Sequence, residues 1–312
     1  MDLSIFKTKP VFSGYLAPEG FIQQVLGELE QVFAVYDRLI FAEGPPQQTF
    51  WSQNVWKNPR VLQIASINEA AKQLRQIQRN WCLYSICAHR RAHLIQEKLP
   101  HLSLKPITFP ASLPQLPMGS WTLLAPDFLI ASSDCSSLFQ HGQLHFEENR
   151  TGPPSRAYLK LWEALTLAGK YPVQGERCLE IGASPGGWSW VLEKTGSDVL
   201  CVDRSELIPE LMRSPRVTFR KGDAFAIRPE KEEGFDWIFS DVICYPEKLL
   251  SWLHTWLDTG APIQFVCTIK FQGQEHYEIL HEFSKIPHSR ILHLSHNKHE
   301  LTWIRTVPAT KN

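Results

Sequence analysis

Long apolar runs and an excess of charge of one sign are both lacking in this 312-residue chain. No run reaches the ~18 apolar residues that a membrane-spanning helix needs, and the N-terminus lacks the apolar core of a secretion signal. Thirty-two basic residues balance thirty-two acidic ones, so no global field attracts the protein to nucleic acids or membranes. We therefore expect a soluble, cytoplasmic protein in which any site for a polyanion is local.

Metal-binding cysteine motifs are also lacking. No Cys-x-x-Cys pair or Cys/His group among the seven cysteines has the spacing of a zinc site, and Cys82 and Cys87 are five positions apart. Cys178, Cys201 and Cys267 lie in apolar runs, as expected of small buried residues in a reducing compartment. The sequence therefore predicts no metal site.

A proline-rich break at Thr151-Gly152-Pro153-Pro154 divides the chain near residue 150. Before it, residues 1–150 mix strand-like runs with amphipathic helices, which predicts a smaller N-terminal α+β domain of one or two units. The predicted strands are Val32–Phe41, Val61–Ala65, Trp121–Ile130 and Gln143–Phe146, and the predicted helices include Phe21–Leu29 and Asn68–Gln78.

After the break, strands and helices alternate regularly. This rhythm predicts a parallel sheet with right-handed crossovers, that is, a Rossmann-like α/β domain over residues 151–312. The last two strands are too close together for a helical crossover, so they should form a hairpin that adds one antiparallel strand near the edge. The predicted strands are Cys178–Ile181, Val199–Val202, Val217–Arg220, Asp236–Ser240, Ile263–Ile269, Ile291–Leu294 and Leu301–Thr306.

A glycine-rich turn joins the first of these strands to a helix. Gly182, Gly186 and Gly187 would let the backbone approach a ligand closely. Asp203 follows Gly182 by 21 positions, about the spacing at which an acid reaches a ribose diol. The turn is not the Gly-x-Gly-x-x-Gly that binds a pyrophosphate. It therefore favours S-adenosylmethionine, which has no phosphate, over a dinucleotide; an ordinary βαβ unit is the alternative.

Polar residues follow several of the predicted strands, where ligands bind in such sheets. Asp223 would accept a hydrogen bond from an adenine amino group, with Phe225 as an apolar wall. Asp241 and Lys270 would end neighbouring strands as an opposite-charge pair beside the methyl donor. A lysine is normally protonated, but burial can lower its pKa enough for it to act as a base or a polarising cation. Taken singly, each residue has a second interpretation as a solvated strand end.

Two further charged residues, Lys160 and Glu300, complete the candidate set. Ser155 is predicted to cap a helix that begins after two prolines, with Lys160 and Arg156 on its more polar face. Glu300 opens the last strand. The alternatives are an ordinary helical Lys160–Glu163 pair and an edge-strand charge.

These motifs resemble the FtsJ-like RNA ribose 2′-O-methyltransferases, in particular the bacterial RlmM family of 23S ribosomal RNA cytidine 2′-O-methyltransferases. Lys160, Asp241, Lys270 and Glu300 occur in the order of the family's Lys-Asp-Lys-Glu tetrad. The resemblance covers about 150 residues, from Thr151 to Arg305. Its motifs are Pro154 to Ala164, Ser184-Pro185-Gly186-Gly187-Trp188, and Asp241 through Pro246-x-Lys248 to Trp256-Leu257.

The resemblance implies methyl transfer from S-adenosylmethionine to a ribose 2′-oxygen of RNA, with ribosomal RNA as the expected partner. It implies Lys270 as the central catalytic residue, with Asp241 balancing its charge and Lys160 and Glu300 orienting the ribose. A serine stands at Ser184, where the family usually has Cys or an equivalent. The predicted cofactor contacts are Ser155, Gly182, Ser184, Pro185, Gly186, Gly187, Trp188, Asp203, Asp223 and Asp241.

For residues 1–150 the resemblance implies RNA recognition by a ferredoxin-like unit and a THUMP domain, although the region is short for both. A basic stretch between residues 75 and 105 carries one acid, Glu97, and interleaves Trp81 and Tyr84. It would bind phosphates and stack bases, or else be a solvated helix face with buried aromatic residues. Its basic residues are Arg75, Arg79, Arg90, Arg91, Lys98 and Lys105.

Other functions stay open at this point. A cytosine C5-methyltransferase needs a nucleophilic cysteine, and Cys244 stands three residues after Asp241, although Ile243 replaces the proline that usually precedes it. The segment Asp241-Val242-Ile243-Cys244 disfavours an amino-methyltransferase. A catalytically silent RNA-binding protein is the non-enzyme alternative, and a monomer without metal or membrane partners is favoured.

Overall fold

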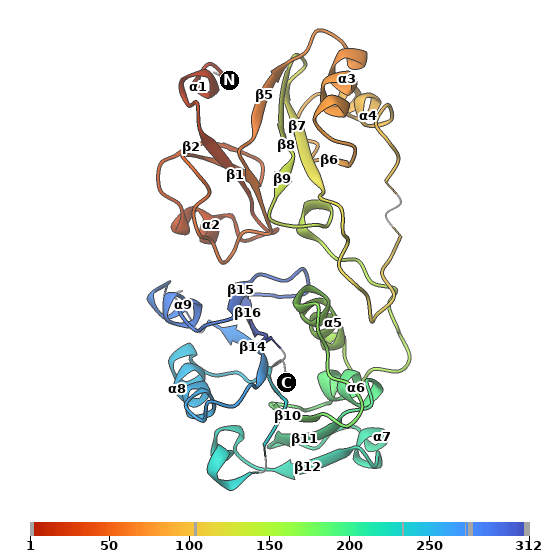
Figure 1. Cartoon of the computed structure of the whole chain (residues 1–312), viewed down its shortest axis with the longest axis vertical. Helices are drawn as coiled ribbons and strands as arrows, with labels where there is room; N and C mark the ends of the chain where they lie inside the picture. The colour runs from red at the N-terminus through yellow and green to blue at the C-terminus, as the bar shows by residue number, and fades with distance from the viewer. Residues whose placement is uncertain (1–2, 103–104, 233, 272, 274–276, 309–312) are drawn as a thin grey trace. The chain divides into compact units, whose positions relative to one another are not determined.

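The computed structural model describes the chain except for residues 1–2, 103–104, 233, 272, 274–276 and 309–312. The chain forms two compact units (Figure 1): Met1–Ile107 with Leu113–His145, and Thr108–Ser112 with Phe146–Asn312. A single cut at residue 150 does not describe this division, because the chain enters the second unit briefly at residues 108–112. There Phe109 stacks on Trp162, with ring centroids 5.1 Å apart.

The first unit contains two sheets. The five-stranded sheet has the order β2-β3-β1-β4-β9, and the four-stranded sheet has the order β5-β8-β7-β6. The strands are β1 (Phe12–Leu16), β2 (Val32–Tyr36), β3 (Leu39–Glu43), β4 (Asn54–Lys57), β5 (Arg60–Gln63), β6 (Trp81–Leu83), β7 (Gly119–Ala125), β8 (Phe128–Ser132) and β9 (Asp134–Cys135). The helices are α1 (Ile5–Thr8), α2 (Ile22–Glu28), α3 (Ile67–Ile77) and α4 (His89–Gln96), with a 3₁₀ turn at Gln140–Gly142.

The two faces of the four-stranded sheet pack into different cores. Leu129 belongs to a cluster with Leu74 of α3 and Ile95 of α4. The next residue, Ile130, belongs to a cluster with Phe41 of the five-stranded sheet. Successive side chains of a strand point to opposite faces, so β8 is apolar on both faces and is buried between two layers.

Three predicted strands of this unit need correction. Val32–Phe41 is a hairpin, β2 and β3, because the chain reverses at Asp37 with a positive φ of 54°. Trp121–Ile130 is likewise a hairpin, β7 and β8, which pair antiparallel. Gln143–Phe146 is not a strand and contains only an isolated bridge residue at Phe146. In all three, short apolar runs were joined or extended because periodicity alone does not mark a tight reversal.

The four-stranded sheet also differs from the expected ferredoxin-like unit. Among the described residues its elements follow the order β5, α3, β6, α4, β7, β8, that is, β-α-β-α-β-β. A ferredoxin-like unit has the order β-α-β-β-α-β.

The second unit is a seven-stranded sheet with the order β12-β11-β10-β13-β14-β16-β15. Helices α8 and α9 cover one face, and α5, α6 and α7 lie on the other (Figure 1). The strands are β10 (Arg177–Ile181), β11 (Asp198–Asp203), β12 (Val217–Lys221), β13 (Trp237–Ser240), β14 (Gln264–Lys270), β15 (Ser289–Leu292) and β16 (Glu300–Arg305). The helices are α5 (Ala157–Ala168), α6 (Gly187–Lys194), α7 (Pro209–Met212), α8 (Pro246–Leu257) and α9 (Tyr277–Ser284), with 3₁₀ turns at Ala224–Ala226 and Pro229–Lys231.

This arrangement confirms the predicted Rossmann-like α/β fold. Strands β10 to β14 are mutually parallel where they pair, and β16 runs antiparallel between β14 and β15. The chain order reverses at β10, whose neighbours are β11 and β13. Such a switch point is where ligands bind, outside the carboxyl ends of the strands. No helix in the described part of the chain is long and apolar enough to cross a membrane.

One carboxyl group is buried in the centre of this sheet. Glu180 of β10 is 2% exposed, and its Oε2 accepts a hydrogen bond from Ser189 Oγ of α6 at 2.6 Å. Burial raises the pKa of Glu180 to about 8, and the negative charges of Asp241 and Asp203 act in the same direction. The carboxyl group is therefore mostly protonated at neutral pH.

The raised pKa of Glu180 predicts how the stability of the protein depends on pH. Between the ordinary glutamate pKa and about 8, the folded state keeps a proton that the unfolded state has lost, so the free energy of unfolding falls as pH rises. Glu180→Gln removes this dependence. We expect the variant to gain roughly 2–3 kcal/mol relative to wild type between pH 5 and pH 7, measured by urea denaturation. Glu19→Gln, at an exposed glutamate, serves as the control, and equal slopes for all three proteins would contradict the assignment.

Candidate active site

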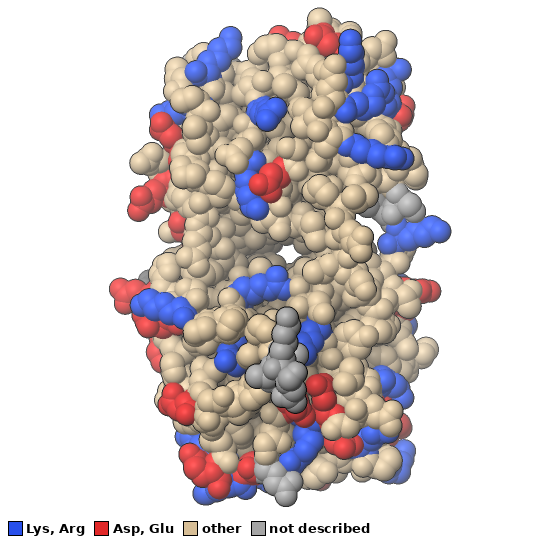
Figure 2. All heavy atoms as spheres, in the orientation of Figure 1, with Lys and Arg blue, Asp and Glu red and all other residues tan. Residues whose placement is uncertain are grey.

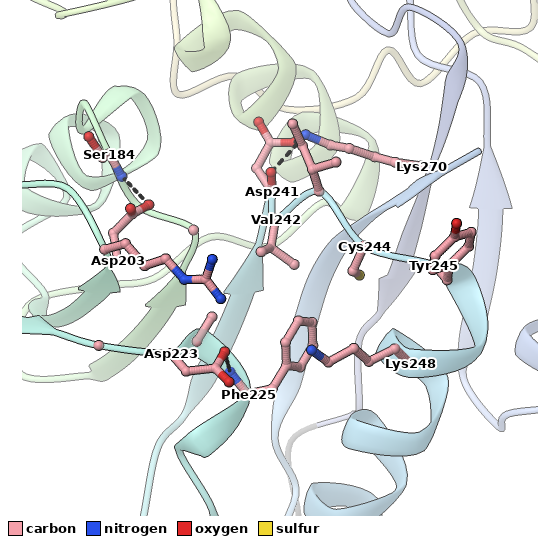
Figure 3. A pocket seen from close by; sticks show the side chains of 15 residues that line it. Ser184, Asp203, Asp223, Phe225, Asp241, Val242, Cys244, Tyr245, Lys248 and Lys270 are labelled. Carbon is pink, nitrogen blue, oxygen red and sulfur yellow. Dashed lines mark hydrogen bonds and ion pairs between the residues drawn. The ribbon is translucent and has the colours of Figure 1, made fainter. Parts of the chain in front are cut away.

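A cavity of about 630 Å³ opens at the carboxyl ends of the central strands (Figure 3). This volume lies within the ~300–1,000 Å³ range of small-molecule sites. Acidic, basic and apolar side chains all contribute to its lining. The lining residues are Gly182, Ser184, Asp203, Arg204, Gly222, Asp223, Ala224, Phe225, Asp241, Val242, Ile243, Cys244, Tyr245, Lys248 and Lys270.

Five of the predicted cofactor contacts line this cavity: Gly182, Ser184, Asp203, Asp223 and Asp241. The Asp203 carboxylate is oriented by the backbone N–H groups of Ser184 and Ser205, at 3.0 and 2.9 Å. Asp223 accepts from the N–H of Phe225 at 3.1 Å. A carboxylate offers about four acceptor sites, so both groups keep capacity for a ligand hydroxyl or amino group.

The other predicted contacts, namely Ser155, Pro185, Gly186, Gly187 and Trp188, are not among the lining residues. Trp188 is buried, and its Nε1 donates to the carbonyl of Ala157 at 3.0 Å. A Cβ at Gly187 would lie 2.5 Å from Ser155 Oγ, and one at Gly186 would lie 2.3 Å from a Leu211 methyl group. These two glycines therefore allow the turn to pack closely against α5 and α7.

The expected polar face of α5 also needs correction. Every residue from Tyr158 to Thr166 is buried, and Lys160 is only 7% exposed. The helix begins at Ala157 with Arg156 as its N-cap, and no side chain makes a capping hydrogen bond there. Ser155 Oγ instead accepts from the Ala157 N–H at 3.4 Å. Because α5 packs on all sides, Lys160 points into the protein and not towards solvent.

The structure brings together the four residues of the predicted tetrad. Lys160 Nζ lies 3.1 Å from Asp241 Oδ1 and 2.5 Å from Glu300 Oε1. Lys270 Nζ lies 3.0 Å from Asp241 Oδ1 and 3.8 Å from Glu300 Oε2. The antiparallel register of β14 and β16 places Lys270 directly opposite Glu300. The two lysines and two carboxylates thus form one closed, electrically balanced cluster.

Mutual attraction keeps Lys160 and Asp241 ionised despite their burial. Burial alone would lower the pKa of Lys160, but the charges of Asp241 and Glu300 outweigh it and raise that pKa above its ordinary value. Burial alone would raise the pKa of Asp241, but Lys160 and Lys270 outweigh it and hold that pKa below its ordinary value. Lys160 is therefore a permanent cation, and Asp241 a permanent anion, at neutral pH.

Sequence reasoning missed Thr268, which makes a further hydrogen bond to the Asp241 carboxylate. Its Oγ1 donates to Asp241 Oδ1 at 2.8 Å, while Lys270 Nζ donates to the backbone carbonyl of Asp241 at 2.7 Å. Thr268 and Lys270 are two residues apart on β14, so they share a face. The signal in the sequence that could have identified it is its place as a polar residue in an apolar strand, two positions before the lysine.

Glu163 was also missed as a functional candidate. It accepts from Ser295 N and Oγ at 2.8 and 2.9 Å, and from His296 Nδ1 at 2.8 Å. Its partners lie in the loop between β15 and β16, so the proposed Lys160–Glu163 pair is not formed. Glu163 instead ties α5 to the loop that leads into Glu300. Glu300 is not an edge charge either, because β16 lies between two strands.

Cys244 lies at the cavity but is poorly suited to nucleophilic attack. The residue is 9% exposed, and burial raises the pKa of its thiol to about 11, although Lys248 and Lys270 act in the opposite direction. A thiol must be deprotonated to act as a nucleophile. At neutral pH this group is a neutral, mostly buried thiol.

The basic stretch of the first unit exposes several positive charges, but its two aromatic residues are not accessible for stacking on bases. Trp81 and Tyr84 are buried, so the prediction that they stack bases is wrong. Figure 2 shows Lys and Arg side chains gathered over α3 and α4. Arg91 is partly buried and donates to the carbonyl of Ala65 at 3.3 Å. The exposed basic residues of the stretch are Arg75, Arg79, Arg90, Lys98 and Lys105.

In the described part of the chain, no group of three or more His, Cys, Asp or Glu side chains is placed to hold a metal ion.

Comparison with known proteins agrees with this geometry. Residues 153–279 match the model of the FtsJ-like methyltransferase family. The Ribosomal RNA large subunit methyltransferase M of Halorhodospira halophila (strain DSM 244 / SL1) is 38% identical over 107 residues, covering 33% of this chain and 31% of that protein. The protein of the same name from Thauera aminoaromatica is 28% identical over 170 residues, covering 49% and 46%.

One similar solved structure is that of a TehB-like SAM-dependent methyltransferase from Corynebacterium glutamicum. Its alignment covers 49% of this chain and 97% of that protein's chain. Its TM-score is 0.32, and it is 18% identical to this chain.

The seven-stranded sheet and the cavity at its switch point define a Rossmann-like methyltransferase domain. Residues 153–279 are similar to the FtsJ-like methyltransferase family, and the curated relatives that this part of the chain resembles carry the name Ribosomal RNA large subunit methyltransferase M. The matched segment spans less than half the length of each of these two relatives.

The buried cluster predicts a large loss of stability when one cation is removed. Lys160→Met removes a cation from both Asp241 and Glu300, and among the described residues Lys270 stays as the cation paired with these two carboxylates. We expect the free energy of unfolding to fall by about 3–5 kcal/mol, the usual cost of breaking a buried pair. Urea denaturation measures it. Lys285→Met, which breaks an exposed pair with Glu282, should cost less than ~1 kcal/mol. Equal losses in the two variants would contradict a buried, coupled cluster.

Proposed function

We propose that this protein transfers a methyl group from S-adenosylmethionine to a ribose 2′-hydroxyl of RNA, with ribosomal RNA as the substrate class. The observation that carries the proposal is the four-residue cluster of Lys160, Asp241, Lys270 and Glu300 beside a cavity at the sheet's switch point. Its support is chemical: the site offers a positioned lysine, an anion that fixes it, and adjoining space for a nucleoside-like ligand.

The cavity lining fits this cofactor. Asp203, at the end of β11, presents a carboxylate to ribose hydroxyl groups, and Asp223 presents one to an adenine amino group. The ring of Phe225 provides an apolar wall beside Asp223, and Lys248 lies over that ring at 4.3 Å from its centroid. When bound, the cofactor supplies an electrophilic methyl group on a sulfonium.

Lys270 is the proposed catalytic residue because its ammonium is already oriented. Two of its donors are directed at the backbone carbonyl and Oδ1 of Asp241, at 2.7 and 3.0 Å. An ammonium has three donors, so one remains for the hydroxyl of the acceptor ribose. Held there as an ammonium, Lys270 Nζ donates to the 2′-oxygen and stabilises the oxyanion that develops on it; only as a neutral amine can the same nitrogen take the hydroxyl proton. Lys160 and Glu300 fix the position of this group and orient the ribose.

An RNA substrate follows from the acceptor group, because DNA has no 2′-hydroxyl. Ribosomal RNA is the substrate class that the names of the relatives give for those proteins. The exposed arginines of α3 and α4 support a role for the first unit in holding the phosphate backbone, since they lie outside its folded core.

Cytosine C5 methylation is the second candidate function, and the neutral Cys244 thiol argues against it. Two variants separate the two reactions. Lys270→Ala removes the donor to the ribose oxygen and should reduce 2′-O-methylation of unmodified total RNA by roughly 10²-fold or more. Cys244→Ala should leave most of the activity. Labelled S-adenosylmethionine followed by nucleoside mass spectrometry measures both. A base-methylated product that is lost in Cys244→Ala would overturn the proposal, and cofactor binding without any transfer would favour a silent RNA-binding protein.

Two exposed arginines of the basic stretch, Arg79 just after α3 and Arg90 in α4, make a separate prediction about affinity. The double variant Arg79→Glu/Arg90→Glu should weaken RNA binding roughly tenfold or more and reduce its salt dependence, because fewer phosphate counterions are displaced. Filter binding with unmodified total RNA over a salt series measures this effect. Lys7→Glu on α1 is the matched charge reversal and should change affinity less. If both proteins bind alike while circular dichroism shows both folded, α3 and α4 do not bind RNA.

A further inference from the structure

Two large apolar side chains stand in solvent beside the proposed catalytic lysine. Ile243 is 75% exposed and Tyr245 is 61% exposed, and both line the cavity that Lys270 lines. Ile243 is the most exposed large hydrophobic side chain in the described part of the chain. Single exposed apolar residues are ordinary on a protein surface. Two of them on either side of a buried residue, at the mouth of a polar cavity, indicate a contact surface for a ligand.

The backbone holds Tyr245 in a fixed position. Pro246 follows it as the first residue of α8, and a residue before proline is restricted to extended conformations. Tyr245 has φ −67° and ψ 141°, and its carbonyl accepts from the N–H of Lys248 at 3.1 Å. Cys244 between the two exposed residues is buried and anchors the loop. The backbone that carries the ring is thus fixed before any ligand binds, so little ordering of the backbone is needed on binding.

The ring lies on the acceptor side of the cavity. Figure 3 shows Ser184 and Asp203 at one end, Asp241 and Cys244 in the middle, and Tyr245 beyond them at the opposite end. The residues assigned to the cofactor's ribose and adenine are therefore separated from Tyr245 by the segment that starts at Asp241. A ligand that contacts Tyr245 is on the far side of this segment from Asp203.

We propose that Tyr245, with Ile243 beside it, forms the subsite that binds the base of the methylated nucleotide. This inference rests on the proposed function, because it takes the acceptor ribose to lie at Lys270. In a nucleotide the base is attached to C1′, the carbon next to the one that bears the 2′-hydroxyl. A base whose ribose is held by Lys270 therefore has to lie close to that lysine, and the exposed side chains of Ile243 and Tyr245 line the same cavity.

Stacking on an aromatic ring suits an unpaired base. It contributes roughly 1–3 kcal/mol per base in single-stranded recognition and tolerates any base, because every base has a flat face. The subsite would therefore bind and orient the target nucleotide, and it would require that nucleotide to be unstacked from its neighbours. Base identity would be read elsewhere.

The test compares Tyr245→Ala with Tyr245→Phe. Loss of the ring should raise KM for unmodified total RNA roughly 10- to 100-fold, whereas Tyr245→Phe, which keeps the ring, should stay within about threefold of wild type. Affinity for S-adenosylhomocysteine, measured by calorimetry, should be unchanged in both variants. Val173→Ala, at an exposed apolar residue before β10, is the matched control and should behave as wild type.

The outcomes separate this inference from the proposed function. If wild type forms a 2′-O-methylated nucleoside and Tyr245→Ala keeps its KM for RNA, the subsite is wrong and the function stands. Weaker S-adenosylhomocysteine binding by Tyr245→Ala would assign the ring to the cofactor and overturn the subsite as well. If wild type transfers no methyl group, the proposed function fails. Filter binding of RNA in the presence of S-adenosylhomocysteine then decides the subsite: equal affinity for wild type and Tyr245→Ala excludes it, and a tenfold loss retains it.

Discussion

The candidate site depends on one carboxylate, that of Asp241. Its Oδ1 lies within 3.1 Å of both Lys160 Nζ and Lys270 Nζ, and it also accepts from Thr268 Oγ1. Two lysine ammonium groups would repel each other in a half-buried site if this anion were absent. Asp241 follows β13 directly, and its N–H donates to the carbonyl of Ile181 on β10 at 3.4 Å. The anion is therefore fixed by the sheet, and the two lysines are fixed by the anion.

Other elements of the domain place the charged side chains that surround the Asp241 carboxylate. Lys160 comes from a helix that is buried on all sides, and Glu300 comes from a strand whose register with β14 sets it opposite Lys270. Glu163 joins that helix to the loop before Glu300. Glu180, which is buried in β10, is mostly neutral at pH 7 because burial raises its pKa to about 8. It therefore adds little further negative charge next to Asp203 and Asp241.

The parallel sheet and the pair of Asp241 and Lys270 could be predicted from local patterns in chain order, whereas Lys160 and Glu300 were joined to them in a tetrad through the resemblance to the FtsJ-like family. Asp241 and Lys270 end strands, and strands of a parallel sheet share an edge. The environment of Lys160 could not be predicted in the same way, because helical periodicity assumes one solvent face and α5 has none. Gly186 and Gly187 were predicted to contact a ligand, and the sequence did not reveal their second role, which is to allow close packing against Leu211 of α7 and Ser155. The reversal at Asp37 was missed because an apolar run does not show a turn.

In the proposed arrangement, the segment from Asp241 to Tyr245 separates the part of the cavity assigned to the cofactor from the part assigned to the acceptor nucleotide. Asp241 faces the lysines, Cys244 is buried, and Ile243 and Tyr245 are exposed. Burial of Cys244 keeps its thiol protonated, whereas the residues on either side of it, Ile243 and Tyr245, are exposed to solvent. A cysteine that resembles a nucleophile in the sequence is, in the fold, the anchor that holds an aromatic ring at the rim. The chemistry of the site then depends on Lys270, which the same loop contacts through the Asp241 carbonyl.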